Sequence, residues 1–377
     1  MKKSNIGLIT FPVGKAGVIP ISNFLEILSP ISKDIYLITG NEGYDFFNED
    51  GRFIVSGIHH ERGGNIFIRI IKYIFTQLKI SYRMVQISKN IDLWIFFIGG
   101  HALLLPMLTA KLLGKKVILA LAGSSLEGFT PTNNNVSKPI KILENSNRLL
   151  SNHIVIYSSN LIKEWKLEKY MKKISIASRH FLNFDTFKIT KNISERKNLV
   201  GYIGRLSEEK GILNFIEAIQ VATKKREKKE DLEFLIGGDG ELYDKIIKFL
   251  DENNLNNKVK LTGWIPHDEL PNYLNELKLL VLPSYTEGLP NIMLEAMACG
   301  TPILANPVGA IPDVIKDGET GFIIKNNNSE DIAEDIVRIL NHPYLNRIVK
   351  NARNLIEQKF SYDARVEDYK KILREVL

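Results

Sequence analysis

The stretch LLVLPSYTEGLPNIMLEAMACGTPILAN, residues 279–306, indicates the fold of the chain. It begins with an apolar run, 279–284, that suits a buried parallel strand, and it closes with a second such run at 302–306. Between them, Pro290 is expected at the first helical position, where its missing amide costs nothing, and Gly300 just past the helix end. Strand, helix and strand in this order form the βαβ unit of a parallel sheet.

The same alternation of short β-branched runs and helical patterns extends along the whole chain. It predicts the α/β class, with parallel sheets covered by helices. With 377 residues, 44% of them hydrophobic, the chain is long enough for two doubly wound domains that each bury a core. Strands are expected at 5–10, 35–40, 93–98, 116–121 and 153–158, and again at 199–204, 232–237, 259–264, 279–284 and 302–306.

The boundary between the two domains is expected near the middle of the chain. Residues 183–198 are polar and charged and follow neither periodicity, which predicts a linker. The domains would then cover 1–190 and 191–361. The last segment, 362–377, is a helix with room to cross back onto the first domain.

Cysteine usage and hydropathy favour a cytoplasmic protein. A single cysteine, Cys299, excludes an intrachain disulfide, and the N-terminus lacks the pattern of a secretory signal. The apolar stretch 91–110 has the length of a membrane span, but Asp92 and Pro106 argue against one. We expect a buried strand there, followed by a helix over 102–113.

Positive charge is concentrated in the first half of the chain. Residues 1–195 hold 25 Lys and Arg against 14 Asp and Glu, hence +11, and the remainder holds 25 against 29, hence −4. Within the first half, residues 66–89 form an acid-free helical pattern with apolar residues around its cations. This helix either packs on the core with a solvated basic edge or lies on an anionic membrane surface. Nucleic acid is not expected as a partner, because no recognition motif accompanies the charge. The cations along one side of the helix are Arg69, Lys72, Lys79 and Arg83.

Two glutamates flank the start of the helix that the opening stretch predicts. Glu287 lies in the loop, and Glu295 lies inside the helix on the same side as Asn291. The two carboxylates can be on the order of 10 Å apart, a span that fits a ligand with hydroxyls at both ends and a diphosphate between them. The amides of Gly288 and Leu289, at the positive helix end, would face the phosphates. The alternative is a pair of exposed helix-end acids.

Two further loops follow expected strands in the second half. GRLSEEKG begins at Gly204 and carries Arg205 and Lys210, two cations before a helix start, which is what a diphosphate needs. GGDG places Gly238 and Asp239 where backbone can approach a ligand closely. Taken alone, the first could be a solvated loop and the second an ordinary glycine-rich turn.

Together, GRLSEEKG, GGDG and the E-x7-E segment with its continuation GTPILANPVGAIPDVIKDGETGF resemble the retaining glycosyltransferases of family 4. The resemblance runs through 195–362 and extends more loosely into the first half. It implies the GT-B fold, in which two Rossmann-like domains face each other across a cleft. It also implies a hexosyltransferase that moves a sugar from a UDP- or GDP-linked donor to a glycan or lipid-linked acceptor in cell-surface polysaccharide or glycoconjugate synthesis.

The resemblance further implies a role for each matched residue. Arg205 and Lys210 would hold the diphosphate and, with Glu287 on the donor sugar, form the catalytic group. Glu295 would bind the ribose hydroxyls of the nucleotide. The other donor-binding positions would be Gly14, Gly17, Gly204, Gly238, Asp239, Gly288, Leu289, Pro290 and Asn291, with Trp264 and Ile265 at the base.

The first half departs from the family in one respect. Gly14 and Gly17 lie between the first strand and the first helix, where the family has a glycine turn. However, the family carries a histidine after the strand that aligns with KVILALAG, and this chain has Ala122 there, followed by residues 123–125, Gly-Ser-Ser. His101, after the preceding strand, is then a candidate for the sugar contact, or else a hydrogen-bonded structural residue.

The chemistry that the resemblance implies is stabilisation of a leaving diphosphate by fixed positive charge. The seven histidines are scattered, and no D-x-D motif ends a strand, so we expect no metal and no cofactor besides the donor. Two other functions fit the same scaffold: a nucleotide-sugar isomerase or phosphorylase, and a non-catalytic nucleotide-sugar-binding protein. The chain is expected in the cytoplasm, on the inner face of the cell membrane if 66–89 binds lipid.

Overall fold

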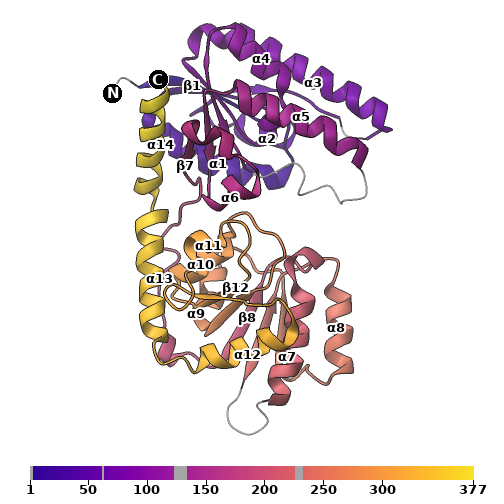
Figure 1. Ribbon diagram of the computed structural model, residues 1–377, viewed down its shortest axis with the longest axis vertical. Helices are drawn as coiled ribbons and strands as arrows, with labels where there is room; N and C mark the ends of the chain where they lie inside the picture. Colours follow the sequence, from indigo (N-terminus) through magenta and orange to yellow (C-terminus); the bar gives the residue numbers. More distant parts are fainter. Residues whose placement is uncertain (1–2, 62, 123–133, 226–231) are drawn as a thin grey trace. The chain divides into compact units, whose positions relative to one another are not determined.

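The computed structural model describes residues 3–61, 63–122, 134–225 and 232–377. The chain divides into two compact units (Figure 1). Unit 1 comprises Met1–Phe181 and Tyr362–Leu377, and unit 2 comprises Leu182–Ser361.

Unit 1 is built on a seven-stranded, all-parallel sheet in the order β3-β2-β1-β4-β5-β6-β7. Chain order reverses between β1 and β4, which makes the sheet doubly wound, as predicted. Its apolar side chains form two buried clusters. The strands are β1 (Ser4–Ile9), β2 (Ser32–Thr39), β3 (Ile54–Gly57), β4 (Leu93–Phe96), β5 (Lys116–Ala120), β6 (His153–Ile156) and β7 (Ile174–Ile176).

Helices cover the sheet of unit 1, and the last helix of the chain, α14, packs against α1 (Figure 1). The stretch 91–110 contains β4 and most of α4. Among the described residues, no helix is both long enough and apolar enough to cross a bilayer. The helices are α1 (Lys15–Leu28), α2 (Glu42–Phe47), α3 (Ile66–Ile87), α4 (Leu104–Leu112), α5 (Asn134–Leu150), α6 (Asn160–Glu164) and α14 (Tyr362–Val376).

Unit 2 repeats the plan with a six-stranded parallel sheet in the order β10-β9-β8-β11-β12-β13. Its chain order reverses between β8 and β11. The strands are β8 (Leu199–Ile203), β9 (Glu233–Gly237), β10 (Val259–Gly263), β11 (Leu279–Leu282), β12 (Ile303–Ala305) and β13 (Phe322–Ile323). The helices are α7 (Ile212–Lys225), α8 (Tyr243–Glu252), α9 (Leu270–Glu276), α10 (Asn291–Ala298), α11 (Ile311–Val314), α12 (Ser329–Leu340) and α13 (Leu345–Phe360).

The segment expected as a linker, 183–198, lies within unit 2. Its polar composition conceals three buried side chains, those of Phe187, Ile193 and Arg196. Because these side chains are spaced irregularly, they produce no helical or strand periodicity in the sequence.

Arg196 is a buried hub of unit 2. Cations favour the carboxyl ends of helices, and Arg196 donates to the C-cap carbonyls of both α9 and α10. Burial lowers the pKa of its guanidinium to about 10. Its acceptors are the carbonyls of Lys191, Leu274, Leu277 and Cys299, at 2.7 to 3.2 Å, and the hydroxyl of Thr301 at 2.9 Å.

We expect Arg196→Ala to lower the free energy of unfolding by about 3 kcal/mol or more, because several buried carbonyls lose their donor together. Denaturant unfolding followed by circular dichroism measures the loss. The matched control is Lys197→Ala, which removes the exposed cation next in sequence and should leave stability nearly unchanged. Equal losses in the two variants would contradict the hub role.

Candidate functional site

Residues from two neighbouring strands of unit 2 meet where the sheet changes direction. Lys210 follows β8 and Glu287 follows β11, and these strands are paired in the sheet. The Lys210 Nζ atom lies 2.8 Å from Glu287 Oε1. Open α/β sheets bind their ligands at this place, at the carboxyl ends of the strands.

Glu287 is held by one of its two carboxylate oxygens. Besides the Lys210 amine, the buried Ser284 hydroxyl donates to Oε1, at 2.7 Å. Ser284 is fixed in turn, because its carbonyl accepts from the Asn306 side chain at 3.0 Å. No group among the described residues donates a hydrogen bond to Oε2, which is left for a ligand.

Glu295, on α10, is held in the same manner by a histidine that no sequence motif marks. His267, in the loop after β10, lies with Nε2 2.9 Å from Glu295 Oε1. The pKa of His267 is raised, chiefly because the hydrogen bond to Glu295 favours the protonated ring. In the described part of the chain, Glu295 Oε2 has no donor. The side chains of Glu287 and Glu295 are only 9% and 8% exposed, so the alternative of two exposed acids is wrong.

The amino end of α10 lies beside Glu287. The helix begins at Asn291, with Pro290 as N-cap, one residue later than predicted. The Gly288 carbonyl accepts from Ala310 N at 2.8 Å, and Leu289 is buried. The first amides of a helix have no intrahelical acceptor and carry partial positive charge, so this end can receive an anion.

The glycine-rich loops after β8 and β9 pack backbone against backbone. Gly204 N donates to Gly237 O at 3.0 Å, and a Cβ on Gly238 would lie 1.9 Å from Gly204 O. Gly238 also has a φ of 127°, which favours glycine. Asp239 builds the same junction, since its carbonyl accepts from Leu206 N at 2.9 Å.

Arg205, Trp264 and Ile265 differ in exposure. The side chain of Arg205 is 70% exposed and lies 3.8 Å from Glu209, so its guanidinium is accessible to a ligand. Trp264 follows β10 and is 77% exposed, whereas Ile265 is buried. A stacking contact with a base would therefore come from Trp264, with Ile265 anchoring the loop.

Unit 1 also contains residues that were expected to contact the donor. Gly14 is the N-cap of α1, and Gly17 lies inside that helix rather than before it. His101 lies 3.8 Å from the buried Glu144, and burial lowers its pKa. These contacts favour a structural role for His101. Ala122 follows β5, and residues 123–125 lie outside the described residues.

The opposite edge of the unit 2 sheet contains a hollow of about 710 Å³. Residues near the amino ends of β8, β9 and β10 line it, among them Lys197, Glu233 and Lys258. None of the expected site residues takes part. In the ranges that the structure describes, no three His, Cys, Asp or Glu side chains are grouped as metal ligands.

Comparison with known proteins identifies the class of this fold. Anabaena Alr3699/HepE in complex with UDP superimposes with a TM-score of 0.77 at 16% identity, over 99% of this chain and 100% of that one. The predicted GT-B fold of two doubly wound units is therefore confirmed. Residues 183–355, nearly all of unit 2, match the family model described as Glycosyl transferases group 1. Unit 2 is therefore similar in sequence to that family, and this similarity indicates a glycosyltransferase.

Two relatives with assigned names illustrate the similarity. Alpha-D-kanosaminyltransferase of Streptomyces kanamyceticus is 27% identical over 293 residues, which are 74% of this chain and 75% of the relative. UDP-Gal:alpha-D-GlcNAc-diphosphoundecaprenol alpha-1,3-galactosyltransferase of Escherichia coli is 31% identical over 169 residues. The second match spans 45% of this chain and 43% of that relative.

Proposed function

We propose that this chain is a retaining glycosyltransferase of family 4. It moves a sugar from a UDP- or GDP-linked donor to a glycan or lipid-linked acceptor in the synthesis of cell-surface polysaccharides or glycoconjugates. The observation that carries the proposal is the pair of glutamates around α10, each held by one oxygen and each with the other oxygen left for a hydroxyl. The UDP complex of the Anabaena structure and the name of the Escherichia coli relative support the donor and acceptor classes.

In this proposal the donor lies across the amino end of α10. Glu295 binds the ribose hydroxyls, Glu287 binds the sugar hydroxyls, and Trp264 stacks on the base. The diphosphate lies against the helix end between the two glutamates. Lys210 has three donors on its amine, so one can remain on Glu287 while the others reach phosphate oxygens.

The reaction breaks the bond between the anomeric carbon and a phosphate oxygen, and that oxygen leaves with the electron pair. Lys210, Arg205 and the amino end of α10 stabilise the negative charge that develops on it. The acceptor hydroxyl attacks on the face from which the phosphate departs, and its proton passes to the phosphate oxygen. Fixed positive charge replaces a metal ion, so the proposed transfer is independent of metals and cofactors.

Lys210→Ala and Glu295→Ala are expected to fail in different ways. Lys210 stabilises charge that grows during the reaction, so its loss should lower kcat by about 100- to 1000-fold. Glu295 binds the nucleotide, so its loss should weaken donor affinity by about 1.5 to 3 kcal/mol. Steady-state kinetics with a UDP-sugar panel and a lipid-linked acceptor extract separate the two effects.

The control for this pair is Glu241→Ala, which removes an exposed acid near the start of α8 and should retain wild-type kinetics. A folded Lys210→Ala variant that transfers sugar at the wild-type rate would contradict the proposed contact between Lys210 and the diphosphate of the donor. Turnover of the donor without any acceptor would instead support an isomerase.

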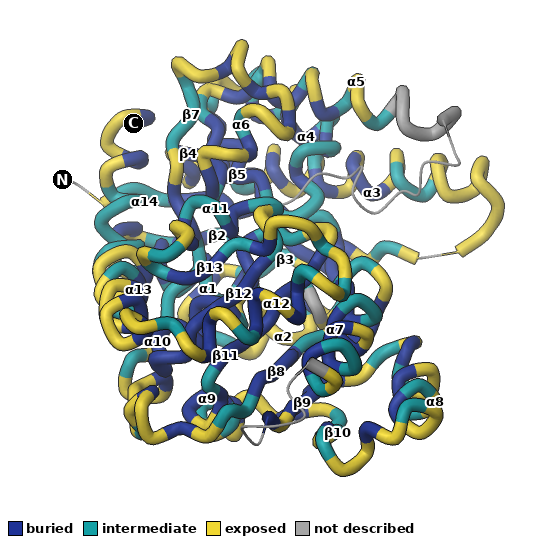
Figure 2. Tube along the Cα trace, turned by 60° about the horizontal axis from the view of Figure 1, so that its bottom comes forward, coloured by how far each residue is buried: buried dark blue, intermediate teal, exposed yellow. Residues whose placement is uncertain are grey.

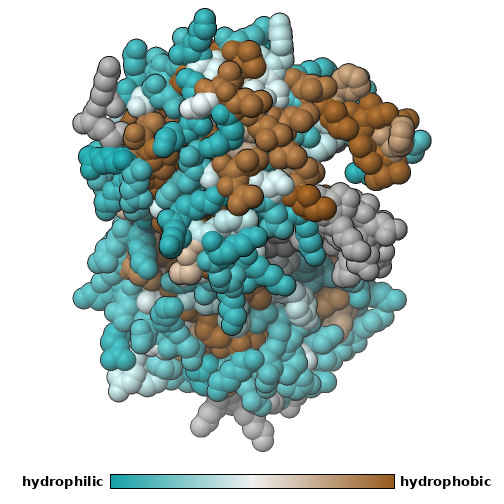
Figure 3. All heavy atoms as spheres, turned by 45° about the horizontal axis from the view of Figure 1, so that its top comes forward, coloured by the Kyte–Doolittle hydropathy of each residue, from teal (hydrophilic) through white to brown (hydrophobic). Residues whose placement is uncertain are grey.

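The proposal includes attachment to an anionic membrane through α3. The prediction left open whether this helix packs on the core, and its amino-terminal part does not: residues 63–71 are all exposed (Figure 2). A hydrophobic patch gathers there in Figure 3. Contiguous apolar surface of this kind marks an interaction site. The exposed apolar side chains include Ile66, Phe67, Ile68, Ile70, Ile71, Ile74, Phe75 and Leu78.

Charge favours lipid as the partner of this surface. No Asp or Glu occurs within α3, and cations such as Arg69 and Lys79 are interspersed with its apolar residues. An amphipathic helix with both features lies in the interface of an anionic bilayer. Lipid attachment on the cytoplasmic face would bring the enzyme to a lipid-linked acceptor.

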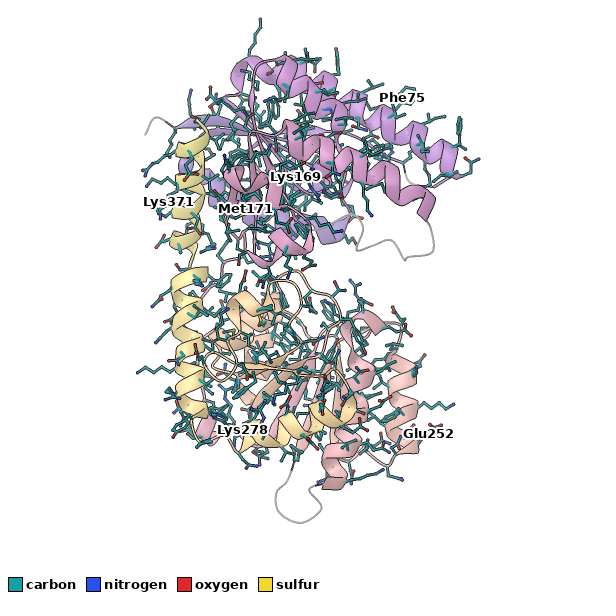
Figure 4. The ribbon with its side chains drawn as sticks, viewed as in Figure 1. Phe75, Lys169, Met171, Glu252, Lys278 and Lys371 are labelled. Atoms are coloured by element: carbon teal, nitrogen blue, oxygen red, sulfur yellow. The ribbon has the colours of Figure 1, made fainter. Side chains whose placement is uncertain are left out.

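We expect Phe67→Asp combined with Phe75→Asp to weaken binding to anionic vesicles by about 100-fold or more, since two phenyl rings that enter the bilayer on binding would be lost. Phe67 and Phe75 are 70% and 59% exposed, and Figure 4 shows Phe75 on the outer side of α3. Co-sedimentation at low salt measures the binding. The control is Phe46→Asp, which changes an exposed phenylalanine on α2. Absence of the wild-type chain from both anionic and neutral pellets would contradict lipid attachment.

A further inference from the structure

Glu295 is an acid at a buried position of α10. An isolated carboxylate in such a place is costly unless a hydrogen-bonded cation accompanies it. Within the described residues, the His267 imidazole is the group that donates to this carboxylate, across 2.9 Å. The partner is distant in sequence and belongs to the loop after β10, whereas Glu295 belongs to a helix that follows β11.

The imidazole itself is fixed by a neighbouring ring. Phe187 meets it edge to face, with centroids 5.3 Å apart and planes at 60°. Phe187 is buried, and its carbonyl accepts from Arg353 at 2.8 Å. The side chain of His267 is nevertheless 70% exposed, so the ring sits at the surface on a rigid support.

We infer that His267 is a positioning residue for nucleotide binding: it holds Glu295 by Oε1 so that Oε2 is set for the ribose hydroxyls. This inference rests on the proposed function. Without His267, the glutamate side chain would regain rotamers that binding must then freeze, and its affinity for the ribose would fall.

The same contact joins two parts of the nucleotide site. His267 and Trp264 lie in one short loop, and the loop is tied to α10 by the imidazole–carboxylate bond. Base and ribose are therefore recognised by one connected element. A histidine with a purely structural role would not affect how the site distinguishes a ribose with hydroxyls from one without them.

The experiment is isothermal titration of the full chain with UDP and with a UDP analogue that lacks both ribose hydroxyls, and with GDP and its analogue in parallel. We expect the wild-type chain to bind the complete nucleotide about 10- to 100-fold more tightly than the analogue. This is the affinity that hydrogen bonds to a charged group usually contribute. His267→Ala should lose most of this preference, because its affinity for the complete nucleotide falls while its affinity for the analogue does not. His267→Gln, which keeps a donor near the position of Nε2, should restore most of the preference.

The control is His342→Ala, which removes a histidine between α12 and α13 of the same unit and should keep the wild-type preference. If Glu295→Ala loses the preference and His267→Ala keeps it, the positioning role is overturned and the proposed function stands. If Glu295→Ala also keeps the preference, the assignment of Glu295 to the ribose is wrong. A wild-type chain that binds neither UDP nor GDP would overturn the donor class and this inference together.

Discussion

The site of unit 2 depends on α10 being anchored at its carboxyl end. Two guanidinium groups hold that end: Arg196 donates to the Cys299 carbonyl, and Arg353 donates to the Ala298 carbonyl. Both cations also complement the negative end of the helix dipole. With this end anchored, the amino end of α10 and the two glutamates around it have fixed positions at the carboxyl edge of the sheet, where a ligand can meet them.

Glu287 and Glu295 share one arrangement, in which a basic side chain holds Oε1 of the carboxylate. A carboxylate that is to bind a hydroxyl must stay charged, keep a fixed orientation and still have a free oxygen. Lys210 and His267 each hold one carboxylate by its Oε1, and Oε2 accepts no hydrogen bond from the described residues in either case. The partners of the two carboxylates come from the loops after β8 and β10, two strands that lie on either side of β9 in the sheet.

Most of the fold and of the candidate site could be predicted from the sequence, and each feature that could not be predicted has a physical reason. All ten expected strands are present, because each is an apolar run buried in a parallel sheet. The three that were not expected, β3, β7 and β13, are edge strands of two to four residues, and none of them is fully buried, so they lack the continuous apolar run of the others. His267 was missed because its pairing with Glu295 joins segments 28 residues apart, and a lone loop histidine gives no sign of it. Whether α3 packs on the core was undecidable, since its apolar residues lie on several sides and the tertiary structure alone shows which are covered.

In the proposed function, the two glutamates bind opposite ends of a nucleotide sugar across the amino end of α10. A crystal structure of the chain with a UDP-sugar bound tests it directly. We expect a ribose hydroxyl within about 3.2 Å of Glu295 Oε2, a sugar hydroxyl at a similar distance from Glu287 Oε2, and a diphosphate oxygen within hydrogen-bond distance of Lys210 Nζ. A bound nucleotide whose ribose contacts neither glutamate, with its diphosphate away from Lys210, would contradict it.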